Sequence, residues 1–432
     1  MEQLLHYVWK HKLFPLHPLK TTLQQDVEVI DPGLHNRNAG PDFFNAKIKI
    51  GGTLWVGNVE IHDKASDWYL HGHDKDERYN NVVLHVCGVI DTEAKNARGE
   101  NLAQLQLDIP VHVQQHYAQL LSTDFYPPCY QIIPHLSQLT VHSWMSALQT
   151  ERLSQKTEAI VRRLQLCDGD WENAYFVTLA RNYGFGINGE AFEQWALTFP
   201  LHIVDHHRDD LFQIEAIFMG QAGLLDLGSV PERYRQAAAK DDYFQKLCHE
   251  YQYLSHKFSL RPMDYRLWRF LRLRPQNFPH IRLSQLANLY YQRQASLSQL
   301  LEATSVNEAG KKLITWVTPY WETHYTFGSE SLRNEKHVSP FSLNLLLINT
   351  VIPLLFAYGQ QRGEEKYCDR AFDFLDALKP ENNHIVRMWK ECGLDVENAG
   401  DSQALIQLKK EYCDKKECLR CRIGYEYLKR KS

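Results

Sequence analysis

The sequence predicts an α+β fold in which an N-terminal mixed sheet with flanking helices is followed by a large all-α domain. Two observations predict this class. The first quarter of the chain holds short alternating apolar segments separated by glycine turns, which is typical of strands. Beyond the paired prolines of segment 121–133, apolar residues recur at helical spacing. We therefore predict domains at 1–125 and 126–400, with a basic, cysteine-containing tail at 401–432.

The order of elements follows from local patterns. Strands joined by a glycine turn form a hairpin at the centre of the N-terminal domain. Here we expect a helix at 2–13, strands at 27–30, 45–50 and 54–62, a helical or loop segment at 66–81 and a strand at 82–87. Later helices are expected at 136–166, 171–182, 189–197, 209–225, 231–258, 284–304, 307–324, 342–361 and 364–377.

Composition limits the class of protein. The 432 residues, 44% of them hydrophobic, suffice for two or three domains with filled cores. The longest apolar run, 343–358, is interrupted by two asparagines and a proline, and the N-terminus lacks the features of a signal peptide. We therefore expect a cytoplasmic protein without a membrane partner. The net charge of -4 does not by itself indicate a nucleic-acid partner.

Two registers of the hairpin place its acidic residues differently. A two-residue glycine turn puts Asp42 opposite Ile61, on the face away from Glu60 and His62. A three-residue loop, 51–53, puts Asp42 opposite His62 and diagonal to Glu60. We predict the second register because it makes one face of the hairpin apolar. Two carboxylates and an imidazole would then cluster where that face opens to solvent.

This cluster predicts a metal site. Two close carboxylates repel unless a cation or a donor neutralises them. Asp42, Glu60 and the carbonyl of Ile61 would hold Mg²⁺ or Mn²⁺, which activates water for phosphodiester hydrolysis. His62 would orient that water or act as its base. In the structural alternative, Asp42 caps the preceding turn and Glu60 pairs with Lys47 or Arg37.

Pro41-Asp42, followed after seventeen residues by Glu60-Ile61-His62, resembles the motif of the PD-(D/E)XK nuclease superfamily. His62 stands where that superfamily most often has lysine, which also stabilises negative charge. The resemblance covers about the first quarter of the chain, and the order helix, three strands, helix, strand agrees with it. It implies a metal-dependent nuclease acting on DNA or RNA, with Glu2 as a further acidic contact. The alternative is a non-catalytic nucleic-acid-binding or scaffold protein on a degenerate nuclease fold.

The whole chain is also similar to an uncharacterised bacterial family known only as a domain of unknown function. This resemblance implies one recurring architecture and no activity. The stretches that carry it are AGPDFFNAKI, WVGNVEIH, SDWYLHGH, YNNVVLHV and EYCDKKECLRCRIG.

A dense run of histidines follows the hairpin and offers a rival activity. His62, His71 and His73 with a nearby carboxylate would suit Zn²⁺, Fe or Mn²⁺ in a metal-dependent hydrolase or oxygenase whose substrate is not nucleic acid. In a nuclease, His71 and His73 would instead contact the scissile phosphate. In the plain alternative these are exposed loop residues. His85, within a strand, is predicted to be a core or sheet-face histidine.

The segment 260–283 predicts a nucleic-acid surface, because arginines bind phosphates and aromatic rings stack on bases. The alternative is that its arginines pair with acids of neighbouring helices. The residues are Arg261, Arg266, Arg269, Arg272, Arg274 and Arg282, with Trp268 among the interleaved aromatics.

The tail predicts a second candidate metal site. Cys413, Cys418 and Cys421 have the spacing of some iron-sulfur ligands and, less closely, of zinc sites. Cys392 is the leading candidate for the fourth ligand, with Cys368 and Cys129 as alternatives. Some PD-(D/E)XK nucleases carry an iron-sulfur cluster with three late cysteines, although their spacing differs. The alternative is three reduced cysteines in a frayed helix.

Overall fold

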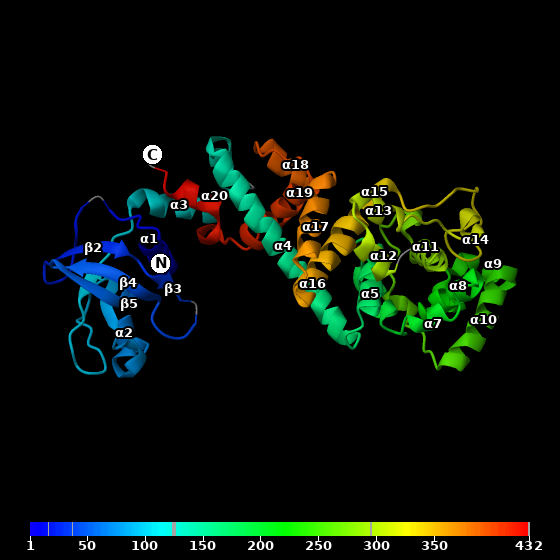
Figure 1. Cartoon of the computed structure of the whole chain (residues 1–432), viewed down its shortest axis with the longest axis horizontal. Coiled ribbons are helices and arrows are strands. Elements are labelled where there is room, and N and C mark those ends of the chain that lie inside the picture. Colours follow the sequence, from blue (N-terminus) through cyan, green and yellow to red (C-terminus); the bar gives the residue numbers. More distant parts are fainter. Residues whose placement is uncertain (16, 37, 123–126, 294–295, 431–432) are drawn as a thin grey trace. The chain divides into compact units, whose positions relative to one another are not determined.

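The computed structural model describes residues 1–15, 17–36, 38–122, 127–293 and 296–430 (Figure 1). It confirms a mixed sheet followed by many helices. The chain forms two compact units. The first comprises 1–144, 392–394 and 408–432, and the second comprises 145–391 and 395–407. Residues 408–432 of the predicted tail therefore belong to the same unit as the N-terminal sheet, and residues 401–407 belong to the second unit. The predicted boundary at 125 lies within 123–126, outside the described residues.

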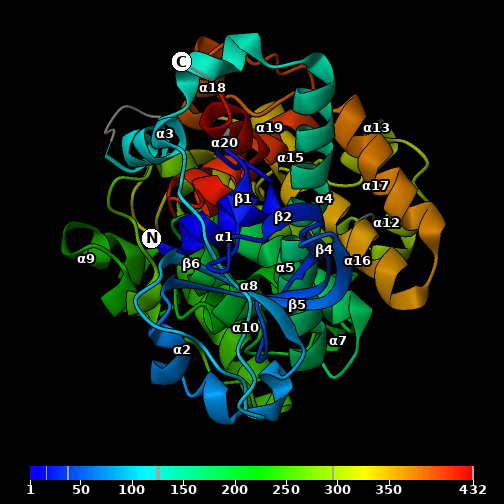
Figure 2. The same cartoon turned by 90° about the vertical axis from the view of Figure 1, so that its left-hand side faces the viewer.

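The N-terminal elements follow the predicted order. Strands β2, β4 and β5 form an antiparallel meander, and β6 and β7 continue the sheet in parallel (Figure 2). Helix α1 (Glu2–Lys10) packs on β5. The strands are β1 (Leu19–Lys20), β2 (Asp26–Asp31), β3 (Leu34–His35), β4 (Phe43–Ile50), β5 (Thr53–Lys64), β6 (Val82–Val89) and β7 (Gln104–Gln106). Between β5 and β6 lie α2 (Asp67–Leu70) and the short 3₁₀ turns η1 (His73–Lys75) and η2 (Glu77–Tyr79).

The predicted three-residue hairpin loop is wrong. Ile50 pairs with Thr53, so the turn contains only Gly51 and Gly52. Their φ angles of 55° and 89° are those of a two-residue turn that glycine adopts without strain. The side chains at the turn end of β5, which the prediction divided between a buried and an outer face, are all exposed, Trp55 to 49%. Burial of an apolar face at this end of the hairpin therefore does not determine the register, contrary to the prediction.

A bulge in β4 nevertheless brings the acids together. Ala46 pairs with Gly57 but Phe43 pairs with Val59, so two residues of β4 lie opposite Asn58. Asn45 takes up the extra residue with a φ of 56°, a conformation that asparagine tolerates better than most residues. The register shifts by one, and Asp42 comes beside Glu60.

The second unit is helical, as predicted, but two predicted helices, 231–258 and 307–324, are each divided. Segment 307–324 contains α13 (Val306–Lys311) and α14 (Pro319–Thr323). Segment 231–258 forms two helices, α9 (Glu232–Lys240) and α10 (Asp242–Phe258). Asp241 separates them because its extended backbone ends α9, while its carboxylate accepts bonds from the N–H groups of Tyr243 and Phe244 and caps α10.

The remaining helices give the second unit its core. Within the described residues one helical stretch, Pro340–Arg362, is long and apolar enough to cross a membrane, but 67% of its apolar window is buried, as in a core helix. The principal helices are α4 (Gln138–Leu166), which spans both units, α5 (Trp171–Tyr183), α6 (Gly189–Ala196), α8 (Leu211–Gln221), α11 (Pro279–Tyr291), α16 (Ile352–Arg362), α17 (Glu365–Ala377), α18 (His384–Glu391) and α19 (Ala399–Gln407).

Candidate metal centre

Asp42 and Glu60 are held by reciprocal bonds to each other's strand. The backbone N–H of Asp42 donates to Oε2 of Glu60 at 3.0 Å, and the N–H of Ile61 donates to Oδ2 of Asp42 at 2.9 Å. Glu60 is only 5% exposed. The Asp42 carboxylate thus reaches across to β5 instead of capping its own turn. Lys47 is exposed on β4, and Arg37 lies outside the described residues.

The pKa values of the two carboxyl groups are shifted in opposite directions. Burial raises the pKa of Glu60, and the charge of Asp42 adds to the rise, although a bond from His73 opposes it. Burial by itself would also raise the pKa of Asp42. The bond with His6 and the N–H of Ile61 outweigh this effect, so the pKa of Asp42 is lowered. Asp42 therefore stays ionised at neutral pH and Glu60 binds a proton more readily.

Two histidines, His62 and His73, approach Glu60, and a third, His71, approaches His62. Nε2 of His73 lies 3.2 Å and Nε2 of His62 lies 3.6 Å from Oε1 of Glu60, and Nε2 of His62 lies 3.2 Å from Nδ1 of His71. One ligand atom from each histidine falls within 4.8 Å of the others. Gly72, with a φ of 74°, reverses the chain between His71 and His73, so both rings turn toward β5. Ligands at 2.0–2.1 Å from a tetrahedral ion lie about 3.3–3.4 Å apart. The contacts of His73 with Glu60 and of His71 with His62, both at 3.2 Å, are close to this separation.

His6 is a site residue that the sequence analysis missed. Its Nε2 lies 3.4 Å from Oδ2 of Asp42. Burial would lower the pKa of His6, but Asp42, then Glu2 and the backbone of Ile61, raise it. Glu2, the predicted acidic contact, lies near this site: burial raises its pKa, His6 opposes the rise, and the charge of Asp42 adds to it. His6 follows Glu2 by four residues on one face of α1, and this spacing could have identified it.

A chain of hydrogen bonds fixes which nitrogen of His62 carries the proton. Oε1 of Gln104 accepts from the N–H of Ala94 at 3.3 Å, and its Nε2 donates to the carbonyl of Thr92 at 3.1 Å. The amide group is therefore oriented, and its N–H₂ also faces Nδ1 of His85 at 3.5 Å. Nδ1 of His85 accepts, so the proton of His85 is on Nε2.

His85 passes this orientation on to His62. Its Nε2 lies 2.9 Å from Nδ1 of His62 and 3.3 Å from Sγ of Cys87. Nδ1 of His62 is then the acceptor, and Nε2 of His62 carries the proton and points toward Glu60 and His71. His85 is fully buried, as predicted for a core histidine, and it also positions His62.

We expect the metal-free protein to lose stability as the pH falls from about 6.5 to about 4. Burial, with the neighbouring histidines, lowers the pKa of His62 to about 3 and that of His85 to about 4. In the unfolded chain both titrate near about 6.5, so in this window the unfolded state binds more protons and the free energy of unfolding rises with pH. His6 acts in the opposite sense. Because its pKa is raised in the folded protein, its contribution to the free energy of unfolding is lost as the pH rises.

Urea unfolding of chelator-treated protein from about pH 7.5 to about pH 5 would measure this dependence. The variant His85→Phe should lose stability less steeply over the same range. Equal slopes for the two proteins would contradict the buried, neutral state of His85.

The fold buries some residues of the predicted nucleic-acid segment, 260–283, and exposes others. Trp268 is buried to 5% exposure and its Nε1 donates to the carbonyl of Ala222, so the prediction that it stacks on bases is wrong. Arg282 is also buried and is bonded to Gln285 and Asn277. Arg266 pairs with Asp264 two residues away. The exposed arginines of the segment are Arg261, Arg266, Arg269, Arg272 and Arg274.

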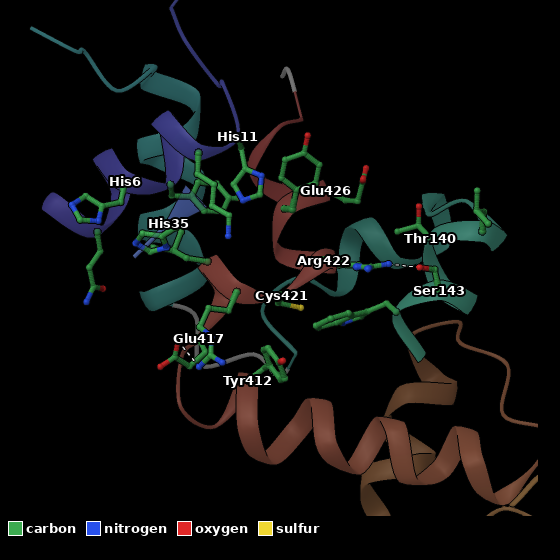
Figure 3. A pocket seen from close by; sticks show the side chains of 18 residues that line it. His6, His11, His35, Thr140, Ser143, Tyr412, Glu417, Cys421, Arg422 and Glu426 are labelled. Atoms are coloured by element: carbon green, nitrogen blue, oxygen red, sulfur yellow. Dashed lines mark hydrogen bonds and ion pairs between the residues drawn. The ribbon is translucent and has the colours of Figure 1, made fainter. Parts of the chain in front are cut away.

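A cavity of about 930 Å³ in the first unit begins at His6. Figure 3 shows His6, His11 and His35 on one side of it and Arg422, bonded to Ser143, on the other. Lys10 and Arg420 add positive charge, and Trp144, Tyr412 and Tyr425 add aromatic rings. Glu417 and Glu426 also line it, so the cavity is mixed in charge with an excess of basic groups.

The cysteines of the tail lie in the first unit. Cys421 is buried, and Cys413 and Cys418 are half-buried. Cys392 follows α18 in the short segment 392–394 of the same unit, and Cys368 lies on α17 in the second unit. Cys129 is buried just before the 3₁₀ turn η3 (Tyr130–His135).

Comparison with known proteins identifies the family but no activity. Residues 2–384 match a family described as a protein of unknown function (DUF2851), and the chain belongs to this family. No curated protein and no solved structure matches the chain.

Proposed function

We propose that the protein is a metal-dependent phosphodiesterase that cleaves DNA or RNA. The observation that carries the proposal is a cluster of three histidines, two of which approach Glu60, a carboxylate that accepts from the backbone N–H of Asp42. The two activities considered from the sequence, one using Asp42, Glu60 and His62 and the other using the histidines, thus involve one site. The chain order of α1, strands β2, β4 and β5, helix α2 and strand β6 supports the proposal, because the resemblance implies a helix, three strands, a helix and a strand.

Asp42, Glu60, His71 and His73 would hold a divalent ion, with the Ile61 carbonyl as the further ligand that the resemblance implies. A bound divalent ion would polarise the scissile phosphate and lower the pKa of a bound water. Asp42, with its lowered pKa, supplies a full negative charge to the ion. His6 contacts the carboxylate of Asp42 and also lines the cavity.

His62 has a different role from the base considered at first. It is neutral at physiological pH and its Nε2 carries a proton, so it donates a hydrogen bond to a phosphate oxygen or to the leaving group. It replaces the hydrogen bond of the superfamily's lysine, although not its charge. Binding a metal through Nε2 of His62 would move its proton to Nδ1. Nδ1–H of His85 would then face the N–H₂ of Gln104, which disfavours that ligand set.

The surroundings supply groups that suit nucleic acid. Lys10, Arg420 and Arg422 in the cavity beside His6 can contact phosphates, and Trp144 and Tyr412 can stack on bases. The exposed arginines of 261–274 are a further candidate surface. A nucleic-acid binder without turnover would use the same groups.

Cleavage assays with the full chain test the proposal. Labelled single-stranded DNA, duplex DNA, branched DNA and RNA would each be incubated with Mg²⁺, Mn²⁺ or Zn²⁺ and with chelator. We expect metal-stimulated cleavage of at least one substrate. No cleavage of any of them would reject the nuclease, and salt-sensitive binding alone would then favour the non-catalytic binder.

The second candidate is a zinc or iron hydrolase acting on another substrate, and the close approach of His62, His71 and His73 favours it. It predicts one tightly bound zinc or iron per chain in the purified protein. This metal would be lost from His71→Ala and His73→Ala, and nucleic acids would not be cleaved.

A further inference from the structure

Four cysteines lie at turns around the start of α20 (Arg422–Leu428) in the first unit. Cys421 caps α20, Cys418 begins the turn η9 (Cys418–Arg420), and Cys413 ends the π-helical turn η8 (Leu408–Cys413). Cys129 immediately precedes η3. Helix α20 packs against both η3 and η9, and η9 packs against η8. The fold therefore gathers one early and three late cysteines.

The thiols are one another's neighbours in a buried setting. Burial raises the pKa of Cys129 well above its ordinary value, and the next contributions come from Cys421, Cys413 and Cys418. Cys129 and Cys421 are 7% and 8% exposed. Thiols in such a site stay protonated by themselves, whereas a bound metal would release their protons and stabilise all the thiolates together.

The turns between the late cysteines are closely built. The N–H of Lys416, whose φ is 56°, donates to the carbonyl of Cys413, and the N–H of Cys421 donates to that of Cys418. A Cβ on Gly424 would lie 2.2 Å from the carbonyl oxygen of Cys418, so only glycine fits there. Burial raises the pKa of Cys421 to about 11, opposed by the N–H groups of Gly424 and Ile423. Backbone N–H groups at sulfur are a recurring feature of metal-bound thiolates.

We propose that Cys129, Cys413, Cys418 and Cys421 bind an iron-sulfur cluster. Three cysteines spaced C-x₄-C-x₂-C with a fourth elsewhere in the chain are a known cluster-ligand pattern. The fourth ligand is Cys129, not Cys392 as the sequence analysis favoured, because the turn η3 that Cys129 precedes packs against α20, which Cys421 caps.

Among the described residues no three of these cysteine sulfurs lie within 4.8 Å of one another, and this suits a cluster better than a single zinc ion. A tetrahedral zinc ion with bonds of about 2.3 Å would hold its sulfurs about 3.8 Å apart. Among the described residues, only the three histidines of the other site bring three ligand atoms within 4.8 Å. In a cluster the thiolates bind more than one iron atom, so not all the sulfurs have to come so close.

Metal analysis of the full chain purified without oxygen tests the proposal. Iron, acid-labile sulfide and zinc would be measured together with the visible spectrum for the wild type, Cys129→Ser and the matched control Cys392→Ser. We expect iron, sulfide and a visible band in the wild type and in Cys392→Ser, and a loss of at least about tenfold in Cys129→Ser. Loss in Cys392→Ser with retention in Cys129→Ser would overturn the ligand set.

A measurement on the wild type alone covers the case in which Cys129→Ser does not fold. Alkylation followed by peptide mapping should label the four ligand cysteines only after the cluster is removed by chelation under oxidation. Zinc in place of iron, or no metal even after incubation with ferrous iron and sulfide, would overturn the proposal.

Discussion

Glu60→Gln is expected to abolish metal-dependent cleavage while leaving the sheet folded. Glutamine keeps the shape of the side chain and can still accept from the N–H of Asp42 through its carbonyl oxygen. It loses the negative charge that lies between His62 and His73. Because a Lewis-acid metal supplies several kcal/mol of transition-state stabilisation, we expect a fall in rate on the order of a thousandfold or more.

Initial rates over a range of metal concentrations would measure this effect. Glu28→Gln is the matched control, since Glu28 is an exposed acid on β2 of the same sheet. Circular dichroism of both variants reports whether the fold is kept. If the Glu60→Gln protein cleaves as fast as the control, Glu60 does not belong to the metal centre.

His62→Gln is expected to lower the cleavage rate by about a hundredfold to ten-thousandfold, the usual contribution of a positioned proton donor. His85→Phe should have a smaller effect of about tenfold to a hundredfold, because it acts only by positioning His62. Metal affinity should change little in either variant if His62 is a donor and not a ligand. His17→Gln, at an exposed histidine, is the control.

Nitrogen NMR of histidine-labelled protein separates positioning from a merely structural effect. In the wild type His62 should carry its proton on Nε2 alone, and in His85→Phe this preference should be lost. A proton on Nδ1 of His62 in the wild type would contradict the donor role and favour His62 as a metal ligand.

The order of elements in the first unit could be predicted because it depends on local alternation and turn residues. The register of the hairpin between β4 and β5 could not be predicted. It depends on Asn45 adopting a left-handed conformation within a strand, and no local sequence pattern requires that conformation. The separation of α9 from α10 had a usable signal, since Asp241 is a strong capping residue placed before a new apolar stretch.

The sequence predicts the site residues of the hairpin and also Glu2, His71 and His73, but it does not predict the contacts that His6 and His85 make there. Asp42, Glu60 and His62 follow from strand geometry, whereas His6 and His85 reach the site through the packing of α1 and the pairing of β5 with β6. The burial of Trp268 likewise depends on contacts with distant helices. Residue type and spacing alone do not distinguish an exposed aromatic ring from a core one.

The bulge at Asn45 also explains the spacing of the acidic motif. In a hairpin with a two-residue turn, an even number of residues always lies between two facing residues. Seventeen residues lie between Asp42 and Glu60, which is an odd number. An odd interval therefore requires one surplus residue, and its location decides which side chains are inverted. A surplus residue in the turn would invert the whole strand, including the buried Ala46 and Ile48. Close to Asp42, the surplus residue changes the direction of the acidic side chain and leaves the core alternation intact, so the end of the strand beside Asp42 can vary independently of the end that packs in the core.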